Sequence, residues 1–287
     1  MRWRGERQSD NVEDRRGMSL PRGAKVGGLS GLGILAIFVI SMLFGIDPSA
    51  VLQNVSQQQP SSVSLPQSSR TAENDDMRNF VAVVLAETED VWRNEFQKMG
   101  RTYQEPRLVL FSGSVESACG MAGSAVGPFY CPADRKVYLD LTFFEELRTR
   151  FGVSGDFAEA YVIAHEVGHH VQTLLGITEK VNRLQPQLNA SERNRLSVMV
   201  ELQADCLAGV WAHQTEKSRR ILEAGDIEEG LNAASAIGDD RIQKSSRGYV
   251  VPDSFTHGSS AQRVRWFKTG LENGTFQSCN TFSADPL

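Results

Sequence analysis

The residues best suited to chemistry lie together in the short stretch His165-Glu166-Val167-Gly168-His169, an HExxH pattern. On a helix, residues four apart lie on one face, so the two histidines can direct their imidazoles at one metal ion. Glu166 lies beside them, where its carboxylate can reach a water molecule. This arrangement is typical of zinc-dependent hydrolysis of peptide bonds, with two histidine ligands and Glu166 as the general base.

A catalytic zinc ion needs a third protein ligand. The segment Glu201-Leu-Gln-Ala-Asp205 lies on a predicted long helix, and its two carboxylates are four residues apart on one face. We expect Glu201 to be the third ligand. We expect Asp205 to accept a hydrogen bond from the far ring nitrogen of His165, an interaction that orients ligand histidines. The neighbouring residues are mostly apolar, and a carboxylate in such surroundings needs a metal or a partner.

Several other side chains are candidates for supporting roles. Peptide hydrolysis needs a hydrogen-bond donor for the tetrahedral oxyanion, and the sequence does not choose between His257, Tyr130 and Tyr249. A structural role at the start of the helix predicted from residue 260 is the alternative for His257. His170 is expected to point away from the ligand face, and His213 lies well over a turn beyond the carboxylate pair and is expected to be structural.

The elements around these residues predict a mostly helical α+β domain with a small β-sheet. Apolar residues recur at helical spacing over 73–99, and the HExxH helix is expected from about 156 to 175. Two strands are predicted at 107–111 and 136–141, and a peptide substrate can add to the edge of such a sheet. A long helix is expected from 191 to about 215. Shorter helices are predicted at 143–151, 178–188, 226–244 and 260–272.

The N-terminal part of the chain divides by composition. Residues 26–46 carry no charge, and an apolar run of this length fits one transmembrane helix. Seven Arg and Lys residues precede the run, and the next basic residue is Arg70. The positive-inside rule then places a basic N-terminus, residues 1–25, in the cytoplasm. Residues 47–72, rich in Ser, Gln and Pro, are expected to be a flexible tether to a domain over 73–287.

A cleaved signal peptide is the competing interpretation of the apolar run. No A-x-A-like cleavage site follows it, so an uncleaved anchor is the prediction. The chain is therefore expected to be a single-pass membrane protein with an extracytoplasmic domain, which would be periplasmic in a Gram-negative bacterium.

Four cysteines in an exported domain fit two disulfide bonds, and three pairings are possible. Cys119–Cys131 is the local choice, which leaves Cys206 to bond Cys279. One alternative is a cysteine zinc site, although no CxxC spacing is present. Another leaves Cys206 as a free buried thiol.

Six segments spread over residues 73–282 match the pattern of a known peptidase family. These segments are Ser117-Ala-Cys-Gly120, Gly127-Pro-Phe-Tyr-Cys-Pro132, Val137-Tyr-Leu-Asp140, the run AYVIAHEVGHHVQ, Glu201-Leu-Gln-Ala-Asp-Cys206 and Phe255-Thr-His-Gly-Ser-Ser-Ala-Gln-Arg263. They resemble the YpfJ-type neutral zinc metallopeptidase family. They are also similar to thermolysin-like gluzincins and HtpX-like membrane peptidases, which pair HExxH with a glutamate ligand and a nearby aspartate on a later helix. The segment from His257 to Arg263 looks like the His-Pro…Arg segment of the HtpX-like enzymes, with Gly258 in place of proline. The resemblance implies that the domain is zincin-like and that the protein is a Zn²⁺-dependent hydrolase of peptides or proteins.

Composition excludes one class of function. The net charge is −5 and the pI is about 5.6, whereas nucleic-acid-binding domains usually carry a basic patch. The predicted function is that of a membrane-anchored extracytoplasmic peptidase. Two alternative functions would use the same metal ligands. A membrane-tethered zinc-binding or scaffold protein would not need Glu166, and an amidase would cleave cell-wall peptides with the same machinery.

Overall fold

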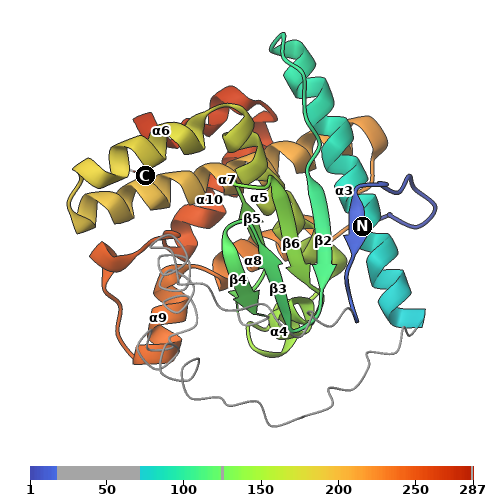
Figure 1. The fold of residues 1–287 in the computed structure, drawn as a ribbon, viewed down its shortest axis with the longest axis horizontal. Coiled ribbons are helices and arrows are strands. Elements are labelled where there is room, and N and C mark those ends of the chain that lie inside the picture. The colour runs from blue at the N-terminus through green and yellow to red at the C-terminus, as the bar shows by residue number, and fades with distance from the viewer. Residues whose placement is uncertain (18–71, 124–125, 286) are drawn as a thin grey trace.

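A four-stranded sheet in the order β1-β2-β6-β5 lies at the centre of the fold (Figure 1). Strands β1, β2 and β6 are parallel, and β5 runs antiparallel to β6 at one edge. Strands β3 and β4 form a separate antiparallel hairpin. The strands are β1 (Val12–Asp14), β2 (Arg107–Phe111), β3 (Ser114–Ser117), β4 (Gly120–Gly123), β5 (Phe129–Cys131) and β6 (Lys136–Asp140). Four of the five residues of β2 and of β6 are buried, as expected of parallel strands covered on both faces.

The computed structural model describes residues 1–17, 72–123, 126–285 and 287. The predicted span at 26–46 and the tether up to residue 71 lie outside this part of the chain. None of the helices within it is both long and apolar enough to cross a bilayer. The prediction of a mostly helical α+β domain with a small sheet is confirmed.

Helices make up most of the domain and agree with the predicted ones in all but one case. Their bounds are α3 (Ala72–Lys98), α4 (Thr142–Thr149), α5 (Asp156–Leu174), α6 (Ile177–Leu184), α7 (Ala190–Arg219), α8 (Asp226–Ala236), α9 (Asp239–Arg247) and α10 (Ser260–Asn273). The single helix predicted at 226–244 is wrong, because Gly238 separates α8 from α9. Gly238 lies so close to α10 that a Cβ there would be 2.4 Å from the backbone nitrogen of Ser260.

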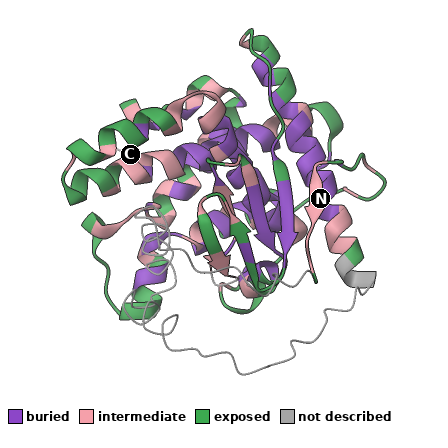
Figure 2. Ribbon diagram, in the orientation of Figure 1, coloured by how far each residue is buried: buried purple, intermediate pink, exposed green. Residues whose placement is uncertain are grey.

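Helix α5 is the central element of the core. Every residue from Phe157 to Gly168 is buried, and the helix packs against α3, α7 and α8. Figure 2 shows the same burial along β2 and β6. Helix α7 begins with a capping box between Asn189 and Glu192, which satisfies its first backbone N–H groups, and it packs against α10 as well as α5. A site built on α5 and α7 is therefore supported by rigid, buried helices.

Residues 1–17 pack against the domain. Strand β1 extends the sheet beside β2, the backbone N–H of Ser9 donates to the carbonyl of Ala82 (2.9 Å), and the Trp3 ring meets Phe80 edge-on. A strand and the sheet it extends lie in one compartment. The pairing of β1 with β2 would place residues 1–17 on the same side of a membrane as the domain, whereas the sequence predicts residues 1–25 in the cytoplasm.

The basic residues of the N-terminal segment form ion pairs with the domain. Arg4 pairs with Asp76 (2.9 Å), and Arg7 pairs with Glu89 (3.1 Å) and Asp90 (2.8 Å), all on α3. These arginines, which the sequence presents as a membrane-topology signal, bind carboxylates of the domain in the fold.

Both predicted disulfides are confirmed. Cys119 bonds Cys131, which links the β3–β4 hairpin to β5, and Cys206 bonds Cys279, which links α7 to the C-terminal tail. Since no cysteine is free, the alternatives of a cysteine zinc site and of a free Cys206 thiol are excluded.

Candidate metal centre

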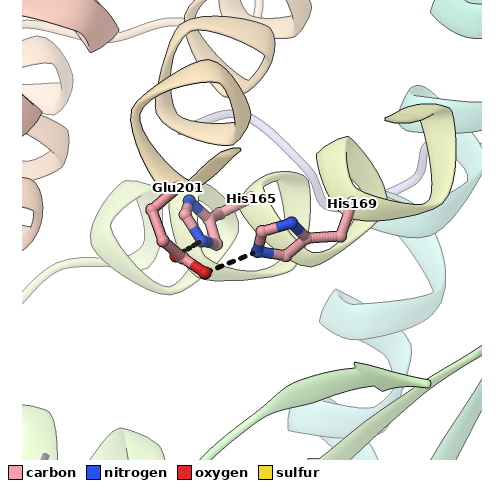
Figure 3. Close-up of side chains that lie close together, drawn as sticks. All are labelled: His165, His169 and Glu201. Carbon is pink, nitrogen blue, oxygen red and sulfur yellow. Dashed lines mark hydrogen bonds and ion pairs between the residues drawn. The ribbon is translucent and has the colours of Figure 1, made fainter. Parts of the chain in front are cut away.

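Helices α5 and α7 bring the three predicted ligands together (Figure 3). The Nε2 atom of His165 lies 3.2 Å from Glu201 Oε2, and the Nε2 atom of His169 lies 3.6 Å from Glu201 Oε1. One ligand atom from each of the three residues lies within 4.8 Å of the other two. The two histidines come from successive turns of α5, and the glutamate comes from α7.

A glycine inside the motif allows the two helices to approach. A Cβ on Gly168 would lie 3.1 Å from the carbonyl oxygen and 3.2 Å from the Cα of Ala204. Such contacts are tighter than ordinary packing, and the atoms they involve belong to the backbone of α7. The close crossing at Gly168 and Ala204 places Glu201, one turn earlier on α7, opposite the two histidines.

These distances fit a zinc ion. Zinc binds histidine nitrogen and carboxylate oxygen at about 2.0–2.2 Å with tetrahedral geometry, so two of its ligand atoms lie roughly 3.3 Å apart. The separations of 3.2 and 3.6 Å agree with this value. Three protein ligands leave one of four positions for water or substrate, which is the pattern of a catalytic site.

His165 is oriented by a buried charged cluster. Its Nδ1 lies 2.9 Å from Asp205 Oδ1, and Asp205 also accepts hydrogen bonds from Arg263 (Nε and Nη2, both 2.9 Å) and from the hydroxyl of Tyr161. Burial opposes the charge of Asp205, but Arg263 and His165 hold the pKa of its carboxyl below the usual value. An ionised Asp205 can only accept, so Nδ1 of His165 carries the proton and Nε2 faces Glu201. The predicted contact of Asp205 with His165 is present.

The surroundings also shift the pKa values of His165 and Glu201. Burial opposes the charge of His165, but Asp205 and Glu201 raise its pKa to about 10 in the protein alone. Burial likewise opposes the charge of Glu201, but His169 and His257 hold its pKa well below the usual value. A metal ion binding at this site would therefore displace a proton from His165.

Glu166 lies between the two ligand histidines in the chain and is 9% exposed. Burial raises the pKa of its carboxyl, and the nearby His169 and His165 oppose that rise. A carboxylate with a raised pKa is a better proton acceptor near neutral pH.

His257 interacts electrostatically with the carboxylate of Glu201. Its Nδ1 is 2.9 Å from the Thr256 hydroxyl and 3.3 Å from Asp239 Oδ1, and Asp239 also accepts the backbone N–H groups of residues 256–258. Burial opposes the charge of His257, but Glu201 and Asp239 raise its pKa. The structure thus brings His257 within electrostatic range of the candidate centre.

The other two candidate donors, Tyr130 and Tyr249, have surroundings of their own. The Tyr130 hydroxyl lies 3.1 Å from Nδ1 of His170, whose Nε2 lies 2.6 Å from the carbonyl of Gln104. Because a carbonyl only accepts, Nε2 of His170 donates, Nδ1 accepts, and the Tyr130 hydroxyl is committed as the donor. Tyr249 is 62% exposed. His213 binds the carbonyl of Leu271 (2.7 Å), a structural contact.

Two groups at the centre were not identified from the sequence. Arg263, which the sequence presents only as part of a family segment, is 2% exposed and binds Asp205 with two nitrogens. Gln172 lies 2.9 Å from Nδ1 of His169. Its position three residues after His169 on the same helix is a signal that could have identified it.

Comparisons with known proteins agree with this centre. A family model described as "Putative neutral zinc metallopeptidase" matches residues 1–282. The chain is 50% identical to the uncharacterized protein YpfJ of Escherichia coli K12, over 98% of this chain and 99% of that protein. It is 41% identical to the uncharacterized protein Rv2575 of Mycobacterium tuberculosis H37Rv, over 86% of each chain. No solved structure matches the chain.

Proposed function

Because the chain belongs to this neutral zinc metallopeptidase family, we propose that it hydrolyses peptide bonds at the centre formed by His165, His169 and Glu201. The observation that carries the proposal is the convergence of both Nε2 atoms on Glu201, at separations that suit a tetrahedral zinc ion. When bound, zinc supplies Lewis acidity, which makes a water molecule acidic enough to act as a nucleophile near neutral pH.

Glu166 is the proton carrier of the proposed reaction. Its carboxylate takes a proton from the attacking water and delivers it to the nitrogen of the leaving amine. A buried carboxylate with a raised pKa suits both steps, because the same group must accept the proton and then release it.

His257 is the proposed donor to the tetrahedral oxyanion. Asp239 and Thr256 hold its Nδ1, so Nε2 is the ring nitrogen left to donate toward the substrate. We expect His257→Ala to lower kcat by about 10²–10³-fold, as for other oxyanion donors. Zinc content of the purified variant, measured by atomic absorption, is expected to stay unchanged; a loss of zinc would place His257 in metal binding instead.

The edge strand β5 is the proposed binding place for an extended peptide. It is the outermost strand of the four-stranded sheet beside β6, and it contacts α5. The bond from Tyr130 on β5 to His170 holds this edge against the helix that carries the ligands. A peptide that adds to β5 would place its backbone next to the metal ligands.

The deciding experiment compares the full chain with Glu166→Gln, both oxidised and zinc-loaded, on a diverse peptide mixture. The full chain is used because β1 belongs to the sheet. We expect cleavage by the parent and a loss of about 10²–10⁴-fold in the variant, with equal zinc content.

Each other outcome contradicts the proposal in a defined way. Equal cleavage by both proteins would indicate a contaminating peptidase. Zinc binding without cleavage of peptides would favour the zinc-binding scaffold, unless cell-wall peptides offered in parallel were cleaved, which would favour the amidase.

We also propose that the protein is attached to a membrane through the apolar stretch 26–46. The two disulfides support an extracytoplasmic domain, since such bonds persist in oxidising compartments. The pairing of β1 with β2 adds the condition that residues 1–17 lie on the same side as the domain.

Labelling of whole cells with a membrane-impermeant maleimide tests this topology. Cysteine is introduced at the exposed Asp10 in one variant and at the exposed Glu272 in another. Equal labelling of both is expected. Labelling at residue 272 alone would restore the single crossing with a cytoplasmic N-terminus.

A further inference from the structure

The nitrogen of His169 that faces away from Glu201 is held by two buried glutamines in series. Nδ1 of His169 lies 2.9 Å from Gln172 Oε1, and Nε2 of Gln172 lies 3.1 Å from Gln203 Oε1. Gln172 is 1% exposed and Gln203 is 3% exposed. Gln172 comes from α5 and Gln203 from α7, so the pair connects the two helices that carry the metal ligands.

Backbone carbonyls determine the direction of every hydrogen bond in this series. Gln172 Nε2 also donates to the carbonyl of Val200 (2.7 Å), and Gln203 Nε2 donates to the carbonyl of Cys279 (2.9 Å). Carbonyls only accept, so both amide nitrogens must point along the series and both amide oxygens must accept. Gln172 Oε1 is therefore an acceptor, and Nδ1 of His169 carries the proton. Nε2 of His169 then keeps the lone pair that a metal requires.

The series ends on the C-terminal tail. Cys279 is bonded to Cys206 on α7, and the hydroxyl of Thr281 donates to the carbonyl of Met199 (2.6 Å). Cys206, Cys279 and Thr281 are 0% exposed. The tail thus contacts α7 on both sides of Glu201, at Met199, and at Gln203 and Cys206.

We propose that Gln172 and Gln203 are positioning residues that hold His169 in its metal-binding tautomer and couple metal affinity to the disulfide-anchored tail. The proposal rests on the proposed function only in placing the metal at His165, His169 and Glu201. Groups of this kind, which bind the far nitrogen of a ligand histidine, typically contribute 10–100-fold to metal affinity.

Zinc affinity of the full chain, measured by competition with a chromophoric chelator, tests the proposal. We expect Gln172→Met to lower affinity by about 10–100-fold, because methionine fills similar space without accepting the Nδ1–H bond. The zinc affinities of Gln203→Met and of the double variant Cys206→Ala/Cys279→Ala are expected to lie between those of Gln172→Met and the parent. Gln172→Glu is expected to keep most of the affinity, since its carboxylate still accepts from Nδ1.

Gln214 offers a matched control. It also lies on α7 and donates to a carbonyl of the C-terminal segment, that of Gly274 (2.6 Å), but its bond is remote from the ligands. Gln214→Met is expected to bind zinc as the parent does. Denaturant unfolding of each metal-free variant separates loss of fold from loss of affinity.

A second measurement does not need the metal at all. Burial opposes the charge of His169, but Glu201 raises its pKa. Nitrogen-15 NMR of the metal-free protein is therefore recorded above that pKa, where it reports which ring nitrogen of the neutral His169 is protonated. The Nδ1–H form is expected in the parent, and a mixture of tautomers is expected in folded Gln203→Met and in any folded Gln172→Met.

Unchanged zinc affinity and tautomer in folded Gln203→Met and Gln172→Met would overturn the proposal and leave the proposed function intact. Should Gln172→Met not fold, the comparison of Gln203→Met with Gln214→Met decides: equal zinc affinity would overturn the proposal. A parent that binds no zinc would instead overturn the proposed function.

Discussion

The two histidines proposed as metal ligands are one turn apart on α5, yet one is surrounded by charged groups and the other by neutral amides. His165 is held by charges, those of Asp205 and Arg263, with the Tyr161 hydroxyl. His169 is held by the neutral amides of Gln172 and Gln203. Both surroundings protonate Nδ1 and direct Nε2 toward Glu201. The same orientation of the imidazole is thus produced by charged partners at His165 and by neutral partners at His169. Mutations in the two sets of partners should therefore have different consequences.

The charged surroundings depend on complete pairing. Arg263 and Asp205 are both almost fully buried, and each compensates the other. Removing one partner leaves a buried charge without compensation, which costs far more than an unmade neutral hydrogen bond. The neutral partners of His169 act through the direction of their hydrogen bonds, which backbone carbonyls set by accepting from both amide nitrogens. A single substitution among them should lower the free energy of unfolding less, but it should allow both tautomers of His169.

The largest effect is expected from Asp205→Asn. Arg263 would stay buried without its counter-charge, so the free energy of unfolding of the metal-free protein should fall by about 3–5 kcal/mol. Urea unfolding at pH 7 measures this change. The double variant Asp205→Leu/Arg263→Met should recover most of the loss, because it removes both charges. If Asp205→Asn lowers the free energy of unfolding by less than about 1 kcal/mol, the buried charge of Arg263 does not depend on Asp205 for compensation.

A smaller effect on stability is expected when pH is lowered, through protonation of His170, the neutral histidine next to His169. Burial lowers its pKa from 6.5 to about 4, opposed by the bond to Gln104 and aided by Arg135. Since the unfolded chain binds this proton first, stability from this group is full above pH 6.5 and is lost as pH falls toward 4. The loss amounts to at most about 3 kcal/mol.

The variant His170→Gln isolates this contribution. Glu87 and Glu159, whose pKa values burial raises to about 7, bind protons in the folded state and act in the opposite direction over the same range. The quantity to measure is therefore the difference in unfolding free energy between parent and variant at pH 7 and at pH 4.5. A difference that does not change with pH would show that His170 does not titrate as described.

The smallest effect is expected from Tyr130→Phe. This change removes one hydrogen-bond donor to His170 and should cost about 1 kcal/mol of stability. Peptide cleavage at saturating substrate and zinc affinity should stay within twofold of the parent, about the size of 0.4 kcal/mol. A drop of about 100-fold in kcat with the fold intact would return Tyr130 to the oxyanion site and set His257 aside.

Much of the centre could be predicted from local spacing. His165, His169 and the carboxylates of α7 were identified because i,i+4 spacing on a helix places side chains on one face whatever the fold around them. The strands predicted at 107–111 and 136–141 followed from short apolar runs, and the structure has them at 107–111 and 136–140. The disulfides followed from the even count of cysteines and their separation.

The sequence by itself determined the chemistry available to this protein: which residues can bind a metal, which can carry a proton, and which helices present them. The tertiary structure alone decided which distant residues meet them. It brought His257 to Glu201 and Arg263 to Asp205, committed Tyr130 to His170, and placed β1 in the sheet. The physical reason is that these contacts join segments 40 to 96 residues apart. No periodicity in the sequence records such a partner, and only the packing of the helices and the sheet sets the distance.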